Sequence, residues 1–252
     1  MALAALATSA ATPLDVYASH TGSCTKSSPS VNFASYPIHP VPAATVVGAE
    51  ARLQNESLSV CTGASDDDKA NWIWVAVGAA GGTYPRSIVQ IGIGRCVAPN
   101  PQQNTGCDGT MNVLRAWGRD SGAPGCAGFL NQDPWVVRIG EPRANTYTVQ
   151  KGGSSWQFVV GGSTLDTIPA SNICWTGGTA FFFGESYDNG DAIGGFAGDP
   201  LSMTNALYQK AGQSWQSPSF GVGGECPDRS PGPPTYHCVT TNGQGIDFWT
   251  VQ

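Results

Sequence analysis

Short apolar or alternating segments recur along the chain, and turn residues separate them at intervals of about ten positions, as in β-sandwiches. The clearest segments have the length of strands and cover 71–78, 86–95, 113–119, 134–140, 145–150, 155–160 and 179–185. Gly152 and Gly153 separate two of them, so we expect a hairpin between the strands of Tyr147 and Trp156. Only 203–211 has a helix-like pattern, and it is short. In the first 50 residues, which are rich in Pro and Ser, we expect weak strands around Val16 and Val46.

The composition favours the same class. The chain has 33 glycines and 18 prolines, and 12% of its residues are charged, against about 25% in ordinary domains. A hydrophobic fraction of 40% is sufficient for a core. We predict an all-β fold, an antiparallel double-sheet β-sandwich of the concanavalin-A-like or jelly-roll kind with loop-rich flanks. It forms one domain over 15–252, and 1–14 is a signal-peptide remnant or a disordered tail.

Eight cysteines without any CxxC pair predict disulfides instead of a metal site, and therefore a secreted protein. Two pairs each enclose a short loop, Cys96 with Cys107 and Cys226 with Cys238, so we expect these to be local bridges. The other four cysteines pair over longer range. Cys61 with Cys174 and Cys24 with Cys126 is one possible assignment.

Several function classes are disfavoured. A net charge of −6 argues against a nucleic-acid partner, and no apolar run reaches the ~20 residues of a membrane span. Common nucleotide-binding and hydrolase motifs are absent. The histidines, His20, His39 and His237, fall in the flanks, where we expect exposed loops. We therefore expect no metal and no cofactor. We also expect the protein to be a monomer.

Two polar residues interrupt strongly apolar strands. Alternation places Gln90 on one face with Gly92 and Gly94, so that face is open beside the glutamine and has room for a ligand or another backbone to approach. Glu185 ends an aromatic stripe that begins at Phe181, and partial burial there would raise its pKa. Each residue has a structural alternative: Gln90 bonded to a neighbouring strand, or Glu185 reaching solvent.

The order of these segments resembles the glutamic peptidases of the eqolisin type, over roughly 51–195. Their WVGI, LQTG, AWxEW and AEWIVE elements correspond here to WVAVG at 74–78, IVQIG at 88–92, AWGRD at 116–120 and AFFFGE at 180–185. The resemblance implies a concanavalin-A-like sandwich and an acid endopeptidase. Gln90 and Glu185 would be its catalytic residues, holding a water molecule, and Trp74, Trp117 and Phe183 would contact a peptide or protein substrate. Phe181 replaces the first glutamate of the AEWIVE element.

A second function class fits the same composition. Eight tryptophans on a sandwich of low charge also suit a non-catalytic secreted protein that binds carbohydrate or a cell-surface polymer. Acidic turns at 66–68 and 188–191 could offer oxygen ligands to calcium, but neither has the EF-hand spacing, and solvated turns are the better explanation of both.

Overall fold

The structure is a computed structural model. It describes residues 32–38, 45–53, 58–59, 70–79, 87–96, 111–119, 131–132, 136–139, 144–186, 192–193, 201–218, 224–225, 236–242 and 245–251.

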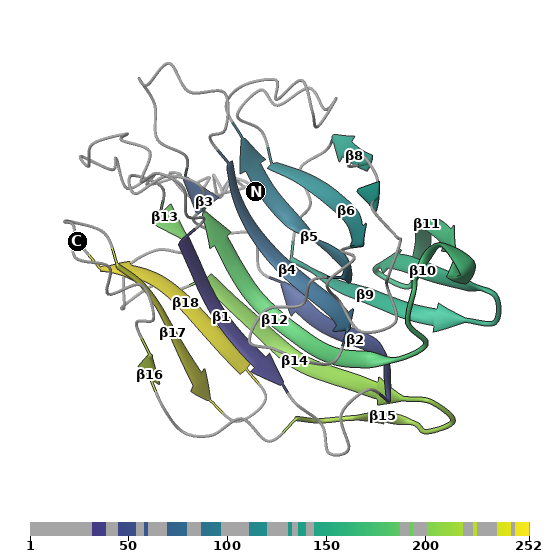
Figure 1. The fold of residues 1–252 in the computed structure, drawn as a ribbon. Coiled ribbons are helices and arrows are strands. Elements are labelled where there is room, and N and C mark those ends of the chain that lie inside the picture. Colours follow the sequence, from purple (N-terminus) through teal and green to yellow (C-terminus); the bar gives the residue numbers. More distant parts are fainter. Residues whose placement is uncertain are drawn as a thin grey trace, which may run out of the picture.

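Antiparallel strands form a first layer whose central members are long (Figure 1). Its spatial order is β1 (Asn32–Ile38), β12 (Gly178–Ser186), β4 (Ala70–Ala79), β5 (Ile88–Cys96) and β6 (Met111–Arg119), and the short β7 (Asn131–Gln132) and β8 (Val136–Ile139) pair with β6.

A second antiparallel layer packs against the first, with β2 and β9 lying against β4. Its order is β11 (Ser163–Pro169), β10 (Ser155–Val160), β9 (Asn145–Gly152), β2 (Val46–Leu53), β14 (Leu201–Lys210), β18 (Gly245–Val251), β17 (Tyr236–Asn242) and β16 (Gly224–Glu225). The short β15 (Trp215–Gln216) pairs with β14. A single pair, Gly178 of β12 with Val46 of β2, joins the two layers into one curled sheet. Outside it lie a two-stranded sheet, β3 (Leu58–Ser59) with β13 (Ala192–Ile193), and the 3-10 turn η1 (Ala170–Asn172).

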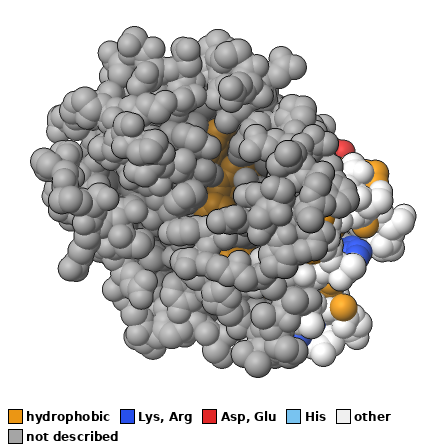
Figure 2. Space-filling view, viewed as in Figure 1, with side chains coloured by type: hydrophobic (Ala, Val, Ile, Leu, Met, Phe, Trp, Pro, Cys, Tyr) orange, Lys and Arg blue, Asp and Glu red, His pale blue; other side chains and the backbone are white. Residues whose placement is uncertain are grey.

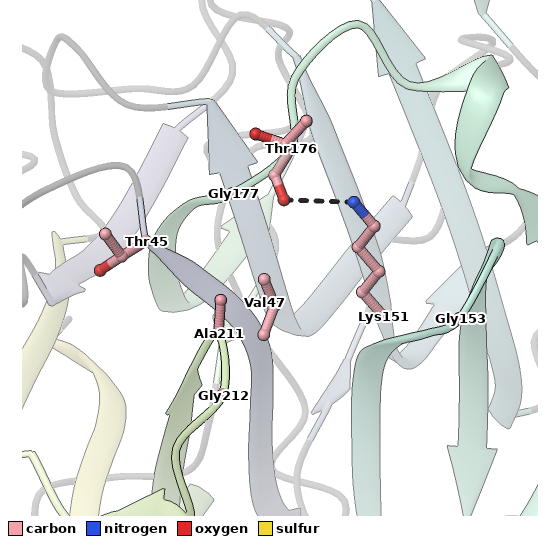
Figure 3. Close-up of a pocket in the computed structure, with 8 residues that line it drawn as sticks. All are labelled: Thr45, Val47, Lys151, Gly153, Thr176, Gly177, Ala211 and Gly212. Carbon is pink, nitrogen blue, oxygen red and sulfur yellow. Dashed lines mark hydrogen bonds between the residues drawn. The ribbon is translucent and has the colours of Figure 1, made fainter.

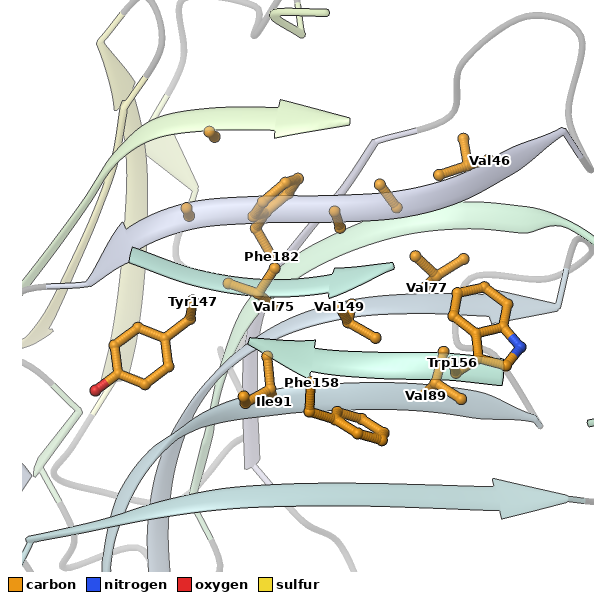
Figure 4. Packing of buried hydrophobic residues seen from close by; sticks show 14 of the residues in the cluster. Val46, Val75, Val77, Val89, Ile91, Tyr147, Val149, Trp156, Phe158 and Phe182 are labelled. Atoms are coloured by element: carbon orange, nitrogen blue, oxygen red, sulfur yellow. The ribbon is translucent and has the colours of Figure 1, made fainter. Parts of the chain in front are cut away.

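Alternate residues of both layers meet in one apolar core, shown in Figure 4. The first layer contributes Val75, Val77, Val89, Ile91 and Phe182, and the second contributes Tyr147, Val149, Trp156 and Phe158. Each strand therefore turns one face to the core and the other outward, which is the pattern of a sandwich. The predicted all-β, double-sheet fold is confirmed.

The hairpin predicted around Gly152 and Gly153 is confirmed: β9 and β10 pair in register from Gly152–Ser155 to Tyr147–Val160. Gly153 has φ of 61°, which a residue with a side chain rarely adopts, so glycine is required in this turn. A strand near Val46 is also found, as β2.

The helix-like prediction for 203–211 is wrong, because this segment forms most of β14. Pairing with β2 shifts register between Thr204 and Leu207, and Asn205 has φ of 52°. This bulge inserts one residue, so Met203 and Ala206 both reach the core although they are three positions apart. A bulged strand thus imitated the i, i+3 spacing of a helix.

The C-terminal flank is also richer in strands than predicted. β16, β17 and β18 extend the second layer, and His237 lies in β17 and not in a loop. His20, His39, the strand expected near Val16 and the segment 1–14 lie outside the described residues. The structure records Cys174 as disulfide-bonded. The structure does not describe which cysteine is its partner, so the predicted pairings stay predictions.

Candidate functional site

Gln90 lies on the outer face of the first layer, the face turned away from the core. Its neighbours Val89 and Ile91 point into the core, so alternation turns Gln90 outward. The side chain is nevertheless only 7% exposed. No described residue forms a hydrogen bond with its amide. The amide atoms are not fully buried, so water or a ligand can reach them and form the hydrogen bonds that the sheet does not supply.

The residues beside Gln90 in the same row of the sheet are apolar. Gln90 pairs with Ala76 of β4, and Ala76 pairs with Phe181 of β12. Phe181 is the residue that replaces the first glutamate of the resembled AEWIVE element. Two strand spacings, about 10 Å, separate the backbones of Gln90 and Phe181. The structure thus places a phenyl ring where the resemblance would place a carboxylate.

Glu185 lies on the same outer face as Gln90, but in a different row. It pairs with Trp72 of β4, and Trp72 pairs with Gly94 of β5. Glu185 is four residues along β12 from Phe181, about 13 Å at the usual strand rise. The register does not bring Gln90 and Glu185 into one row, and the Glu185 side chain lies outside what the structure describes. Their action as a pair stays a prediction.

Indole rings fill the space expected beside Gln90. A Cβ added to Gly94 would lie 1.4 Å from Cε3 of Trp72, and one added to Gly92 would lie 2.9 Å from Cε3 of Trp74. The two rings are neighbours, with centroids 5.8 Å apart. Strand β4 fills the space at both glycines, with the backbone carbonyl of Ile73 beside Gly92 and the ring of Trp72 beside Gly94. The expected close approach of another backbone is therefore found at Gly92, and the expected room for a ligand at these two positions is not.

The other predicted contact residues are placed differently from one another. Trp74 is on the outer face but fully buried, and Phe183, also on that face, is 8% exposed. Trp117 pairs with the core residue Val89, so the register puts its position on the core side of the first layer. Sequence reasoning passed over Trp72 and the row position of Phe181, because both depend on strand register.

The outer face is hollowed above these strands. Figure 2, seen from the same side as Figure 1, shows hydrophobic side chains at the base of a hollow over β4, β5 and β12. On this face Phe181, Phe183 and Gln90 keep small exposed fractions, of 4% to 8%. We call this feature the outer hollow. Among the residues whose side chains are described, this face offers apolar contacts and the amide of Gln90.

A separate cavity of about 460 Å³ lies at one end of the sandwich, near the pair that joins the layers (Figure 3). In it the ammonium of Lys151 donates a hydrogen bond to the carbonyl oxygen of Thr176, over 3.4 Å. The described residues that line it are Thr45, Val47, Lys151, Gly153, Thr176, Gly177, Ala211 and Gly212, and none of these is a predicted site residue.

Among the residues that the structure describes, no three His, Cys, Asp or Glu side chains lie close enough together to hold a metal ion. Within the same residues no helix is long and apolar enough to cross a membrane. Burial raises the pKa of Tyr147, but its phenol lies in the core and not in the outer hollow.

The sequence matches no family model and no curated protein. Solved structures do match. Scytalido-glutamic peptidase with a peptide-based transition-state analogue aligns with a TM-score of 0.51 at 13% identity, over 87% of this chain and 98% of that one. SCP-B, an eqolisin-family peptidase in complex with the tripeptide Ala-Ile-His, aligns at 0.50 and 12% identity, again over 87% and 98%. A family 16 endo-glucanase from Bacteroides ovatus aligns at only 0.36, over 59% of this chain, a similarity too low to bear on function. The chain therefore has the fold of the eqolisin glutamic peptidases.

Proposed function

We propose that the protein binds an extended peptide in the outer hollow, with Gln90 as the polar contact. Gln90 carries this proposal: the residue is only 7% exposed, and its amide has no hydrogen-bond partner among the described residues. A glutamine amide presents two N–H donors and a carbonyl acceptor, which complement the C=O and N–H of a peptide group. An extended peptide would supply the partner that the sheet does not.

Two further features support a peptide ligand. Phe181 and Phe183 line the same face and offer apolar contacts to side chains of the peptide. The two eqolisin peptidase structures that share the fold hold a peptide-based transition-state analogue and a tripeptide.

Binding does not require hydrolysis. A glutamic peptidase needs a carboxylate near its glutamine to remove a proton from water. The row of Gln90 holds Ala76 and Phe181, neither of which is acidic. We therefore propose binding without cleavage as the primary function.

Calorimetric titration with Ala-Ile-His and with longer peptides that contain it tests the proposal. We expect Gln90→Ala to weaken binding by about three- to tenfold, the value of one or two hydrogen bonds. Gln157→Ala, a matched change on the opposite layer, should leave the affinity unchanged. Absence of binding, or equal affinities of wild type and Gln90→Ala, would contradict the proposal.

An acid endopeptidase is the second candidate, and the observation that favours it is the shared face of Gln90 and Glu185. In this mechanism the Glu185 carboxylate takes a proton from a water molecule that attacks the scissile carbonyl. The Gln90 amide donates to the oxyanion, and Glu185 returns the proton to the leaving amine. Casein cleavage that peaks below neutral pH and disappears in Glu185→Gln would establish it. No cleavage by the wild type across acid pH would eliminate it and leave peptide binding standing.

We also propose an extracellular location, supported by the eight cysteines. Secretion of the full chain by an expressing cell, with no free thiol in the secreted protein, is the expected result. Retention in the cytosol with reduced cysteines would contradict it.

A further inference from the structure

A row of amide side chains crosses the outward face of the second layer, on the other side of the sandwich from the outer hollow. Strand pairing aligns Gln157 of β10 with Gln150 of β9, Gln150 with Gly48 of β2, Gly48 with Gln209 of β14, and Gln209 with Trp215 of β15. We call these five residues the amide strip. It spans four strand spacings, about 19 Å.

The indole of Trp215 reaches across this strip to Gly48. A Cβ added to Gly48 would lie 2.9 Å from Cη2 of the indole and 3.3 Å from Cβ of Gln209. The ring thus crosses β14 and rests on β2, where glycine leaves room for it. Trp215 remains partly exposed, and no described residue stacks on it or accepts a hydrogen bond from its N–H.

The amides of the strip are held in place but keep free bonding capacity. Gln150 Nε2 donates to Gln157 Oε1 over 3.0 Å, and Gln209 Nε2 donates to the carbonyl of Gln213 over 3.1 Å. Each bond uses one of the two N–H groups of its donor. The carbonyls of Gln150 and Gln209 and the NH₂ of Gln157 have no described partner. All three side chains are partly exposed.

The charges near the amide strip limit the chemical classes of ligand that could bind there. The strip has no charged residue, and the charged residues that follow on the same face of β2, Glu50 and Arg52, have opposite signs. The whole chain carries −6, so an anionic polymer would be repelled. A neutral ligand with closely spaced hydroxyls matches the amides, and apolar C–H faces on that ligand match the indole.

We propose that the amide strip is a binding surface for a neutral polysaccharide, with a sugar ring stacked on Trp215 and hydroxyls paired with Gln150, Gln157 and Gln209. This surface is independent of peptide binding in the outer hollow.

Titration of the whole protein with laminarihexaose and cellohexaose, two neutral glucose hexamers, tests the proposal by calorimetry. We expect Trp215→Ala to weaken binding at least about tenfold, as truncation of a central aromatic contact does. Gly48→Ala should also weaken it, although it removes no contact group, because the added methyl displaces the indole. Thr164→Ala, an exposed change on β11 outside the strip, should have no effect.

Three results would overturn the proposal. The first is that the wild-type protein binds neither hexamer at millimolar concentration, although its cooperative unfolding shows that it is folded. The second is binding that Trp215→Ala and Gly48→Ala leave unchanged. The third is a dimer in sedimentation velocity that Trp215→Ala abolishes, since a second copy of the chain would then occupy the strip. Binding of an oligogalacturonate as tight as that of the glucose hexamers would overturn the neutral class.

Discussion

The outward faces of the two layers use the same pairing of an indole with a glycine, with opposite results. On the first layer Trp72 and Trp74 cover Gly94 and Gly92 and are 1% and 0% exposed. On the second layer Trp215 covers Gly48 and remains partly exposed.

The closeness of the packing accounts for the difference. The first-layer glycines are enclosed by backbone and ring atoms: a Cβ on Gly92 would lie 1.8 Å from the carbonyl oxygen of Ile73. Gly48 meets only the outer edge of an indole, at 2.9 Å. A tryptophan that packs over a glycine within a strand can therefore be buried or partly exposed. Only the partly exposed ring has surface that a ligand can contact.

The largest expected effect tests this difference in packing. Gly94→Ala places a methyl 1.4 Å from a carbon of Trp72, and because β4 fixes the ring, we expect a loss of about 3 kcal/mol or more in the free energy of unfolding. Gly48→Ala needs only the end of one side chain to move, so its cost should stay near or below about 1 kcal/mol. Urea denaturation of both variants measures the contrast. Equal costs would show that the two pairings are packed alike.

The next effect concerns the apolar character of the outer hollow. Phe181→Glu buries a carboxyl group in the row of Gln90, and burial will raise its pKa above the value in the unfolded chain. The folded state then binds the proton more tightly. Below the pKa of the unfolded chain the glutamate is protonated in both states, and the free energy of unfolding should not change with pH. As the pH rises to 7, the free energy of unfolding should fall by on the order of 2 kcal/mol.

Denaturation of Phe181→Glu at pH 4 and pH 7, beside Phe181→Gln as an uncharged control, tests this expectation. The same protein should be assayed for peptide cleavage at acid pH. If the glutamate restores hydrolysis that wild type lacks, Phe181 is the substitution that separates binding from catalysis. A flat pH dependence would mean that the side chain escapes to solvent, and that the row of Gln90 is less enclosed than its exposed fractions indicate.

Sequence alternation was enough to predict the sandwich, because Val75, Val77, Val89 and Ile91 reveal a buried face without any knowledge of their partners. It also placed Gln90 on the outward face. It failed at Asn205, where a bulge changes the phase, and at Gly92 and Gly94, whose space is filled from the neighbouring strand.

Both failures involve register, which is a property of pairs of strands. The amide strip is the strongest example, since its five residues come from five separate strands and form a row only after β2, β9, β10, β14 and β15 have paired. The position of Phe181 relative to Gln90 depends on register in the same way.

The smallest expected effect separates a buried polar group on a face from one in the core. The hydroxyl of Tyr147 is fully buried and has no hydrogen-bond partner among the described residues, and it lies between the layers, where no ligand could reach it. Tyr147→Phe removes an unpaired hydroxyl and should raise the free energy of unfolding by about 1 kcal/mol, leaving peptide affinity unchanged.

Burial raises the pKa of Tyr147, so the folded protein retains this proton where the unfolded chain loses it. Wild type should therefore keep its stability below about pH 10 and lose up to about 1.4 kcal/mol per pH unit above it, and Tyr147→Phe should lack that part of the loss. Urea denaturation from pH 8 to pH 11 measures both effects. A variant less stable than wild type, or with the same alkaline decline, would show that the hydroxyl has a partner.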